Sequence, residues 1–235
     1  MAVVMIVFAY LLVLAFPQAF FSNHVVYQNY EIWSDQPIPP QITQVLDDAT
    51  RRLKTSELYK RDRTIRVFFC NASWRLWLYS QQFTDKIGGY ADEWLTRNVY
   101  IRASDMPSNR IYSPGPGPIS DANQRPLSYF IAHEATHIIL SREFGRTEYM
   151  RHPKWLTEGY ADYVGKGGDF NFEENLSLLV SGSPLLDYER SGLYRRFELE
   201  VFFLLNKKGV AVRELFADPP DEDDVLGLLR NSRAP

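Results

Sequence analysis

The segment HEATH, residues 133–137, constrains the fold of this chain more than any other segment. His133 and His137 are four residues apart, so on an α-helix both imidazoles project from the same face. There they can bind one metal ion together, and Glu134 between them is placed to act as a base toward a water molecule on that ion. Histidines buried in an apolar helix without partners would cost free energy. The motif therefore predicts a helix that carries a metal site.

A second helical segment, WLTEGYADYVG, supplies two further acidic side chains. Glu158 lies twenty-one residues after His137, and Asp162 follows one helical turn later on the same side. Glu158 is the expected third ligand, and three protein ligands leave a fourth position open for water. Asp162 is expected to accept a hydrogen bond from the free ring nitrogen of His133 or His137 and so to select the tautomer of that ring.

The pattern His133-Glu134-x-x-His137 followed by Glu158-x-x-x-Asp162 resembles the gluzincin metallopeptidases, the thermolysin-like and M1-aminopeptidase-like branch of the zincins. The residues after His137, IILSREFG, lack the nearby third histidine of the metzincin branch. The GAMEN-type signature of M1 aminopeptidases is also absent from the sequence. The resemblance implies a zincin-like catalytic domain, one Zn²⁺ per chain, and hydrolysis of a peptide or protein substrate with Glu134 as general base.

The resemblance does not identify which residue would donate a hydrogen bond to the oxyanion. Thermolysin-like enzymes have a tyrosine between the second histidine and the third ligand, and M1-like enzymes have one well after it. Tyr194 corresponds to the second arrangement, with Tyr188 as a neighbouring candidate, and Tyr149 corresponds to the first. His152 is the remaining candidate, and no histidine follows it in the chain.

Zincins bind extended substrates beside an edge strand, so the run RNVYIRAS (97–104) is the expected edge strand. Its residues Asn98, Val99, Tyr100 and Ile101 are then the predicted substrate-binding positions. Gly88 and Gly89 before it would either allow close approach of another chain or form a tight turn. The SPGPGP loop that follows would rim the cleft or serve as an exposed connection.

The chain begins with an apolar run, Met1 to Phe21, that contains no charged side chain. About twenty residues at roughly 1.5 Å each match a hydrocarbon core of about 30 Å. We expect a single-pass membrane anchor over residues 1–22, with residues 23–235 forming the catalytic domain on the extracytoplasmic side. A cleaved signal segment that yields a secreted domain is the first alternative, although no Lys or Arg precedes the run. A buried core helix is the second alternative.

Hydrophobic periodicity along the rest of the chain predicts an α+β fold with a small mixed sheet. Strand-like runs occur at 64–70 and on both sides of the turn between Gly89 and Ser104, and helical runs occur at 42–53, 73–83, 126–145, 155–165, 194–207 and 223–232. Residues 23–37 are expected to be extended. Cys70, the single cysteine, lies in the strand-like run IRVFFC and is expected to be buried rather than nucleophilic.

Composition and the completeness of the motif limit the classes of function. The net charge is −3 and no basic stripe is present, so we do not expect a nucleic acid partner. A membrane-anchored zinc peptidase is the principal hypothesis. A catalytically inactive zincin-like domain that serves as a binding or scaffold module at the membrane is the main alternative, and a metal hydrolase acting on another bond is a third.

Overall fold

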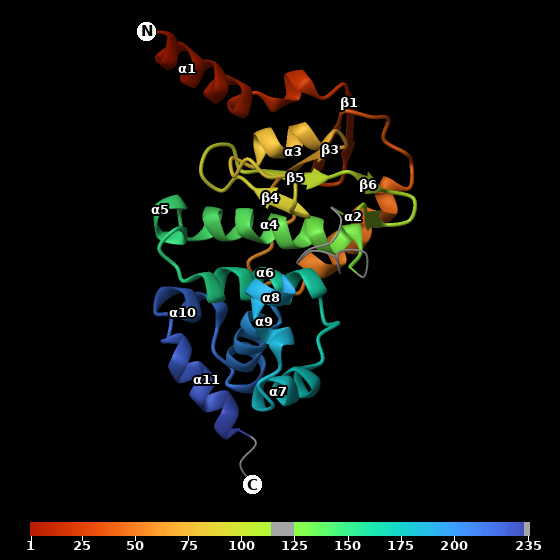
Figure 1. The fold of residues 1–235 in the computed structure, drawn as a ribbon. Coiled ribbons are helices and arrows are strands. Elements are labelled where there is room, and N and C mark those ends of the chain that lie inside the picture. Colours follow the sequence, from red (N-terminus) through yellow and green to blue (C-terminus); the bar gives the residue numbers. More distant parts are fainter. Residues whose placement is uncertain (114–124, 233–235) are drawn as a thin grey trace.

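The computed structural model describes residues 1–113 and 125–232, and a five-stranded mixed sheet lies at its centre (Figure 1). The strands follow the order β1-β2-β3-β5-β4 across the sheet. The pairs β2–β3 and β3–β5 are parallel, whereas β1–β2 and β4–β5 are antiparallel. The strand bounds are β1 (Asn23–Tyr27), β2 (Tyr30–Ser34), β3 (Ile65–Cys70), β4 (Gly89–Ala91) and β5 (Asn98–Arg102). The predicted α+β class is confirmed.

The two faces of the sheet pack against different helices. Along β3, Val67 and Phe69 join the main core, whereas Phe68 and Cys70 join a smaller core on the opposite face, as the two-residue repeat of a strand requires. Figure 1 shows α4 (Leu127–Glu143) on the first side and α3 (Ser73–Tyr79) on the second. Cys70 is buried, as predicted.

Helix α4 is buried from Leu127 to Ser141, which confirms the prediction from its apolar composition. One side of it packs against the sheet, and its other sides pack against α2 (Ile42–Leu53) and α6 (Lys154–Lys166). Arg52 of α2 donates hydrogen bonds to the carbonyl oxygens of Gly165 and Lys166, at 2.8 and 3.0 Å. A cation at the last carbonyls of a helix is favourable, so this contact holds the end of α6 against α2.

The carboxyl-terminal third of the described chain is helical and packs against the far side of α6 (Figure 1). Helix α9 (Arg195–Phe202) continues into a π-helical turn, η4 (Phe203–Lys207), and makes the main contact with α6. The helices predicted at 194–207 and 223–232 are therefore present. The other elements are α5 (Arg146–Tyr149), α7 (Phe172–Val180), η3 (Pro184–Leu186), α8 (Tyr188–Ser191), α10 (Val212–Ala217) and α11 (Glu222–Asn231).

The amino-terminal run forms a helix that is shorter than expected. Helix α1 (Ala2–Ala15) has 14 residues and is followed by the 3₁₀ turn η1 (Pro17–Phe20). Phe16 leaves the helical region because the residue before a proline is sterically pushed out of it, so α1 ends before Pro17. Across residues 1–113 and 125–232, no helix combines the length and the apolar character needed to cross a membrane.

The prediction that residues 97–104 form an edge strand is wrong. Strand β5 lies between β3 and β4, and its residues Asn98 to Ile101 are buried. At this end of the sheet the edge belongs to β4, which pairs antiparallel with β5 and covers it. Asn98, Val99, Tyr100 and Ile101 therefore build the sheet instead of offering their backbone to a substrate. Val99 and Ile101 face the main core and Tyr100 the smaller one, as the alternation predicted.

Two segments for which no strand pairing was predicted contain strands. Residues 23–37, which were expected to be extended, form the β1–β2 hairpin and add two strands to the sheet. Just before the SPGPGP segment, β6 (Ser104–Asp105) pairs with β7 (Arg110–Ile111). Most of the SPGPGP segment lies outside the described residues, so its predicted place at the rim of a cleft is not addressed by the structure.

Candidate metal centre

A cleft of about 420 Å³ lies between α4, α6 and strand β4, and the predicted ligands, the predicted base and one candidate oxyanion donor line it. They come from separate parts of the chain: His133, Glu134 and His137 from α4, Glu158 from α6, and Tyr194 from the residue before α9. The packing of α6 between α4 and α9 brings these segments together.

Three side-chain atoms converge at one end of this cleft. His133 Nε2 lies 3.3 Å from His137 Nε2, and Glu158 Oε2 lies 3.4 Å from the first and 3.6 Å from the second. Donors placed about 2.0–2.2 Å from one ion at tetrahedral angles are separated by about 3.3–3.6 Å. Histidine, histidine and carboxylate in this arrangement therefore fit a tetrahedral metal ion with one remaining open position.

The ring of His133 is oriented from behind by Asp162. His133 Nδ1 lies 3.1 Å from Asp162 Oδ1, the same oxygen to which the Tyr129 hydroxyl donates a hydrogen bond. Lys166 Nζ lies 3.1 Å from Asp162 Oδ2 and also contacts Glu198. When the Nδ1–H of His133 donates a hydrogen bond to Asp162, Nε2 carries no proton. Its lone pair then points toward the place where His137 Nε2 and Glu158 Oε2 converge. Of the two rings that the sequence left open for Asp162, the structure selects His133.

Charge within this network favours a carboxylate at Asp162 and a basic ring at His133. Burial alone would raise the pKa of Asp162, but Lys166 and the hydrogen bond from His133 outweigh it and hold that pKa well below its usual range. Burial alone would lower the pKa of His133, but Asp162 and Glu158 outweigh it and raise the pKa to about 10. A proton and a metal ion therefore compete for this ring.

The second histidine is held by a tyrosine. His137 Nδ1 lies 2.8 Å from the Tyr149 hydroxyl, and that hydroxyl donates a hydrogen bond to Glu93 Oε1 at 3.3 Å. Tyr149 thus lies behind the ring, on the side away from the converging donors, and this position does not suit an oxyanion donor. Its contacts make it a positioning residue for His137. Glu93, whose pKa is raised by burial, carried no signal in the sequence because it follows β4 in a turn far from the motif.

Glu134 lies against strand β4, and glycine makes this approach feasible. A Cβ at Gly89 would lie 2.7 Å from Glu134 Cγ and 2.9 Å from Oε1, and a Cβ at Gly88 would lie 2.4 Å from the Phe130 ring. The glycines therefore let β4 pack closely against side chains of α4, and the predicted approach of another chain stays a prediction. Burial raises the pKa of Glu134 to about 7, against the opposing effect of charge on His133 and His137. A carboxyl group with this pKa can both accept and release a proton near neutral pH.

Replacing Gly89 by alanine is expected to push the carboxylate of Glu134 out of place without unfolding the protein, because the atoms in conflict belong to the side chains of Glu134 and Ile101 and not to the backbone. Displacement of a reacting group by about 1 Å can cost up to about 100-fold in rate. For the peptidase activity that the motif predicts, the expected result is a loss of about 10- to 100-fold in kcat with unchanged zinc content, measured by peptide hydrolysis and elemental analysis. Gly227→Ala is the matched control, since nothing lies within 4 Å of a Cβ there. A wild-type kcat in Gly89→Ala would show that Glu134 does not need this position.

The remaining oxyanion candidates are separated by the structure. Tyr194 lines the cleft, and its ring lies nearly parallel to that of His133, with 6.1 Å between centroids. Burial, followed by the nearby charge of Glu158, raises the pKa of Tyr194 well above its usual value, so it remains a hydrogen-bond donor. His152 is absent from the cleft lining: its Nε2 lies 2.8 Å from the carbonyl oxygen of Phe216, and its ring packs on Phe144. His152 therefore connects the α5–α6 loop to α10.

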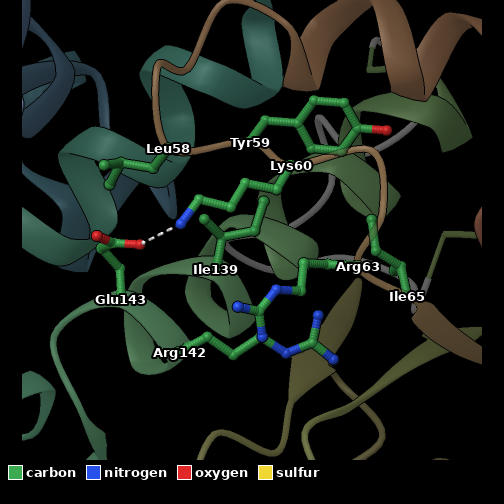
Figure 2. Close-up of a pocket in the computed structure, with 8 residues that line it drawn as sticks. All are labelled: Leu58, Tyr59, Lys60, Arg63, Ile65, Ile139, Arg142 and Glu143. Atoms are coloured by element: carbon green, nitrogen blue, oxygen red, sulfur yellow. Dashed lines mark hydrogen bonds and ion pairs between the residues drawn. The ribbon is translucent and has the colours of Figure 1, made fainter.

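A second, smaller hollow lies at the far end of α4 and has a different character (Figure 2). Its volume is about 30 Å³, enough for one or two water molecules. Arg63 and Arg142 both line it, and Lys60 Nζ lies 3.4 Å from Glu143 Oε2 (Figure 2). This surplus of cations does not suit a metal ion, and none of the predicted site residues lines the hollow. The candidate centre is thus the cleft between α4, α6 and β4.

The sequence pattern did not identify several residues that contact the candidate ligands or Asp162, directly or through Lys166. Lys166 and Glu198 stand four and thirty-six residues after Asp162, with no motif connecting them. Tyr129 precedes His133 by one helical turn, a spacing that could have identified it as a neighbour of the ring.

Comparison of the chain with models of known protein families, with curated proteins and with solved structures gives no match in any of the three.

Proposed function

We propose that this chain is a zinc-dependent peptidase of the gluzincin type, with a zincin-like catalytic domain that binds one Zn²⁺. The observation that carries the proposal is the convergence of His133 Nε2, His137 Nε2 and Glu158 Oε2 within 3.3–3.6 Å of one another. Glu134 lies beside them in the same cleft. The choice of zinc follows the resemblance of the motif to gluzincins, because such a ligand set also binds other first-row metals.

Each side chain of the centre has a role in this proposal. Bound Zn²⁺ would polarise the scissile carbonyl and lower the pKa of a water molecule towards about 7. Glu134 accepts the proton of the attacking water and then delivers it to the leaving amine, in keeping with its pKa of about 7. Tyr194 donates a hydrogen bond to the oxygen on which negative charge develops. Asp162 and Tyr149 hold the two imidazoles in the orientation that the ligands need.

The substrate in this proposal is an extended polypeptide that pairs with β4. One edge of β4 is hydrogen-bonded to β5, and no described strand pairs with the other. Gly89, Tyr90 and Ala91 of this strand line the cleft beside Glu134. A peptide added to this edge would gain main-chain hydrogen bonds while its backbone passes the reacting groups.

The proposal is tested on purified full-length protein by elemental analysis and by mass spectrometry of a peptide library after incubation. We expect about one zinc per chain, cleavage of part of the library, loss of cleavage with a chelator and recovery with zinc. Zinc binding without cleavage of any peptide would favour the inactive binding module or a hydrolase of another bond. A folded protein that takes up no zinc would contradict the metal centre itself.

Two tyrosines close to the centre are expected to respond differently to the same substitution. Tyr194→Phe removes a donor to the developing oxyanion, so kcat should fall about 10²- to 10³-fold with little change in KM or zinc affinity. Tyr149→Phe removes the hydrogen-bond partner of His137, so zinc affinity should fall about 10- to 100-fold. Steady-state kinetics and competition with a chromogenic chelator separate the two effects. The reverse pattern would assign the oxyanion role to Tyr149.

A further inference from the structure

Three large aromatic side chains are exposed on and next to α3. The exposed fractions are 53% for Trp74, 45% for Trp77 and 52% for Phe83. We call these three residues the aromatic patch. Single exposed apolar residues are common on soluble proteins, but a group of large aromatic rings on one short segment is typical of an interaction surface.

The aromatic patch adjoins the base of helix α1. The Phe83 ring lies 4.9 Å from that of Trp77 and 6.2 Å from that of Tyr10, measured between centroids. The Tyr10 hydroxyl donates a hydrogen bond to the carbonyl oxygen of Leu78 at 3.0 Å, and Leu14 is buried in the smaller core. The carboxyl-terminal half of α1 is thus attached to the face of the domain that carries α3. In Figure 1 the amino-terminal half of α1 projects away from the rest of the molecule.

The exposed part of α1 is apolar around its whole circumference. Val3 to Phe8 are six consecutive apolar residues with exposed fractions of 51–72%. At about 100° per residue they point in all directions around the helix axis. A protein groove or a second helix covers one stripe of such a helix, whereas lipid surrounds all of it. No Asp, Glu, Lys or Arg precedes Glu31.

From this arrangement we propose that α1 enters a phospholipid bilayer and that the aromatic patch is a second lipid contact, at the membrane–water interface. Tryptophan prefers this interface because its ring is apolar and its N–H remains hydrogen-bonded. The patch adjoins the point where α1 leaves the domain, through the contact between Phe83 and Tyr10, so both surfaces can meet the bilayer at once. The two contacts together fix the orientation of the domain on the membrane, which α1 alone would leave free.

This orientation has a consequence for the cleft, which rests on the proposed peptidase function. Gln82 and Ile87, on either side of Phe83 in the chain, line the cleft. One rim of the cleft therefore lies next to the proposed lipid contact. The preferred substrates are then polypeptide segments that lie at the bilayer surface, such as the membrane-proximal part of an anchored protein.

The lipid contact is tested by fluorescence of the full chain in phosphatidylcholine vesicles. Because Cys70 is buried and burial raises the pKa of its thiol, a label is directed to cysteines introduced singly at Trp74, Trp77 and Phe83. Ser181→Cys, at the exposed end of α7, is the control. We expect an environment-sensitive fluorophore at the three patch positions to shift to the blue and to be quenched by doxyl-labelled lipid, and the control label to do neither.

Two results would overturn the lipid contact. In the first, the patch labels keep their aqueous emission in vesicles that carry the full chain. In the second, the blue shift occurs without vesicles and grows with protein concentration, which would mean that a second copy of the chain covers the patch.

The consequence for substrates is tested with one peptide, offered free and tethered to the vesicles. The wild type should cleave the tethered form at least about tenfold faster, because tethering raises its effective concentration at the cleft. The variant Trp74→Ser/Trp77→Ser/Phe83→Ser stays attached through α1 but loses its fixed orientation, so it should show a smaller preference and keep the rate on free peptide. An unchanged preference in the variant would contradict the orienting role of the patch. Absence of cleavage of either form by the wild type would refute the peptidase function and leave the fluorescence result standing.

Discussion

Replacing Glu134 by glutamine is expected to abolish peptide hydrolysis while the zinc content stays at one per chain. Glutamine has nearly the same shape but cannot accept the proton of the attacking water, and loss of a general base costs about 10²- to 10⁴-fold in rate. The converging atoms of His133, His137 and Glu158 remain in place. The measurement is kcat on a cleaved library peptide, beside elemental analysis of the same preparation.

Thermal unfolding provides the control for this variant. In the protein without metal, the folded pKa of Glu134 is about 7, above its ordinary value of 4.5. Such a carboxyl group favours folding in its protonated form, so it costs stability as the pH rises from 4.5 through 7. Metal-free Glu134→Gln should therefore melt at or above the wild-type temperature at pH 8, with a smaller difference at pH 4.5. Hydrolysis at the wild-type rate in a variant that melts normally would exclude Glu134 as the base.

Removing Glu158 is expected to abolish the stabilisation that zinc confers on the wild type. Binding at a free zinc concentration of about 100 times Kd stabilises the folded state by about 2.7 kcal/mol. For a chain of this size that corresponds to a rise in Tm of about 5–10 °C. In Glu158→Ala only two ligands remain, so we expect neither the rise nor retention of zinc on gel filtration.

The zinc-dependent difference in Tm is the quantity to compare, because Glu158→Ala can also change the stability of the metal-free protein. Glu148→Ala is the matched control: this glutamate lies on the nearby α5, but its side chain is exposed and pairs with Arg151 at the surface. It should show the full rise in Tm. A full rise in both variants would mean that the metal binds elsewhere on the protein.

Local pattern in the sequence was sufficient to predict the shared helix face of the candidate ligands His133 and His137 and much of the secondary structure. The four-residue spacing of His133 and His137 places both rings on one helix face whatever surrounds the helix, because the period of an α-helix is a property of the backbone. The two-residue alternation in IRVFFC likewise separates Val67 and Phe69 from Phe68 and Cys70. These features depend on neighbours within one or two turns, so the sequence alone determined them.

Tertiary structure decided which strand lies at the edge of the sheet. It also decided on which side of the histidine rings each tyrosine and Asp162 lies. From the sequence, β5 was expected to be the substrate-binding edge. The short strand β4 pairs with its outer side and forms the edge instead. Tyr149 and Tyr194 were equivalent candidates by position in the chain, yet one lies behind His137 and the other lines the cleft. Asp162 meets His133 because Arg52 of α2 and the pair between Lys166 and Glu198 of α9 hold the end of α6 in place. Such choices arise from contacts between residues far apart in the chain, and no local period encodes them.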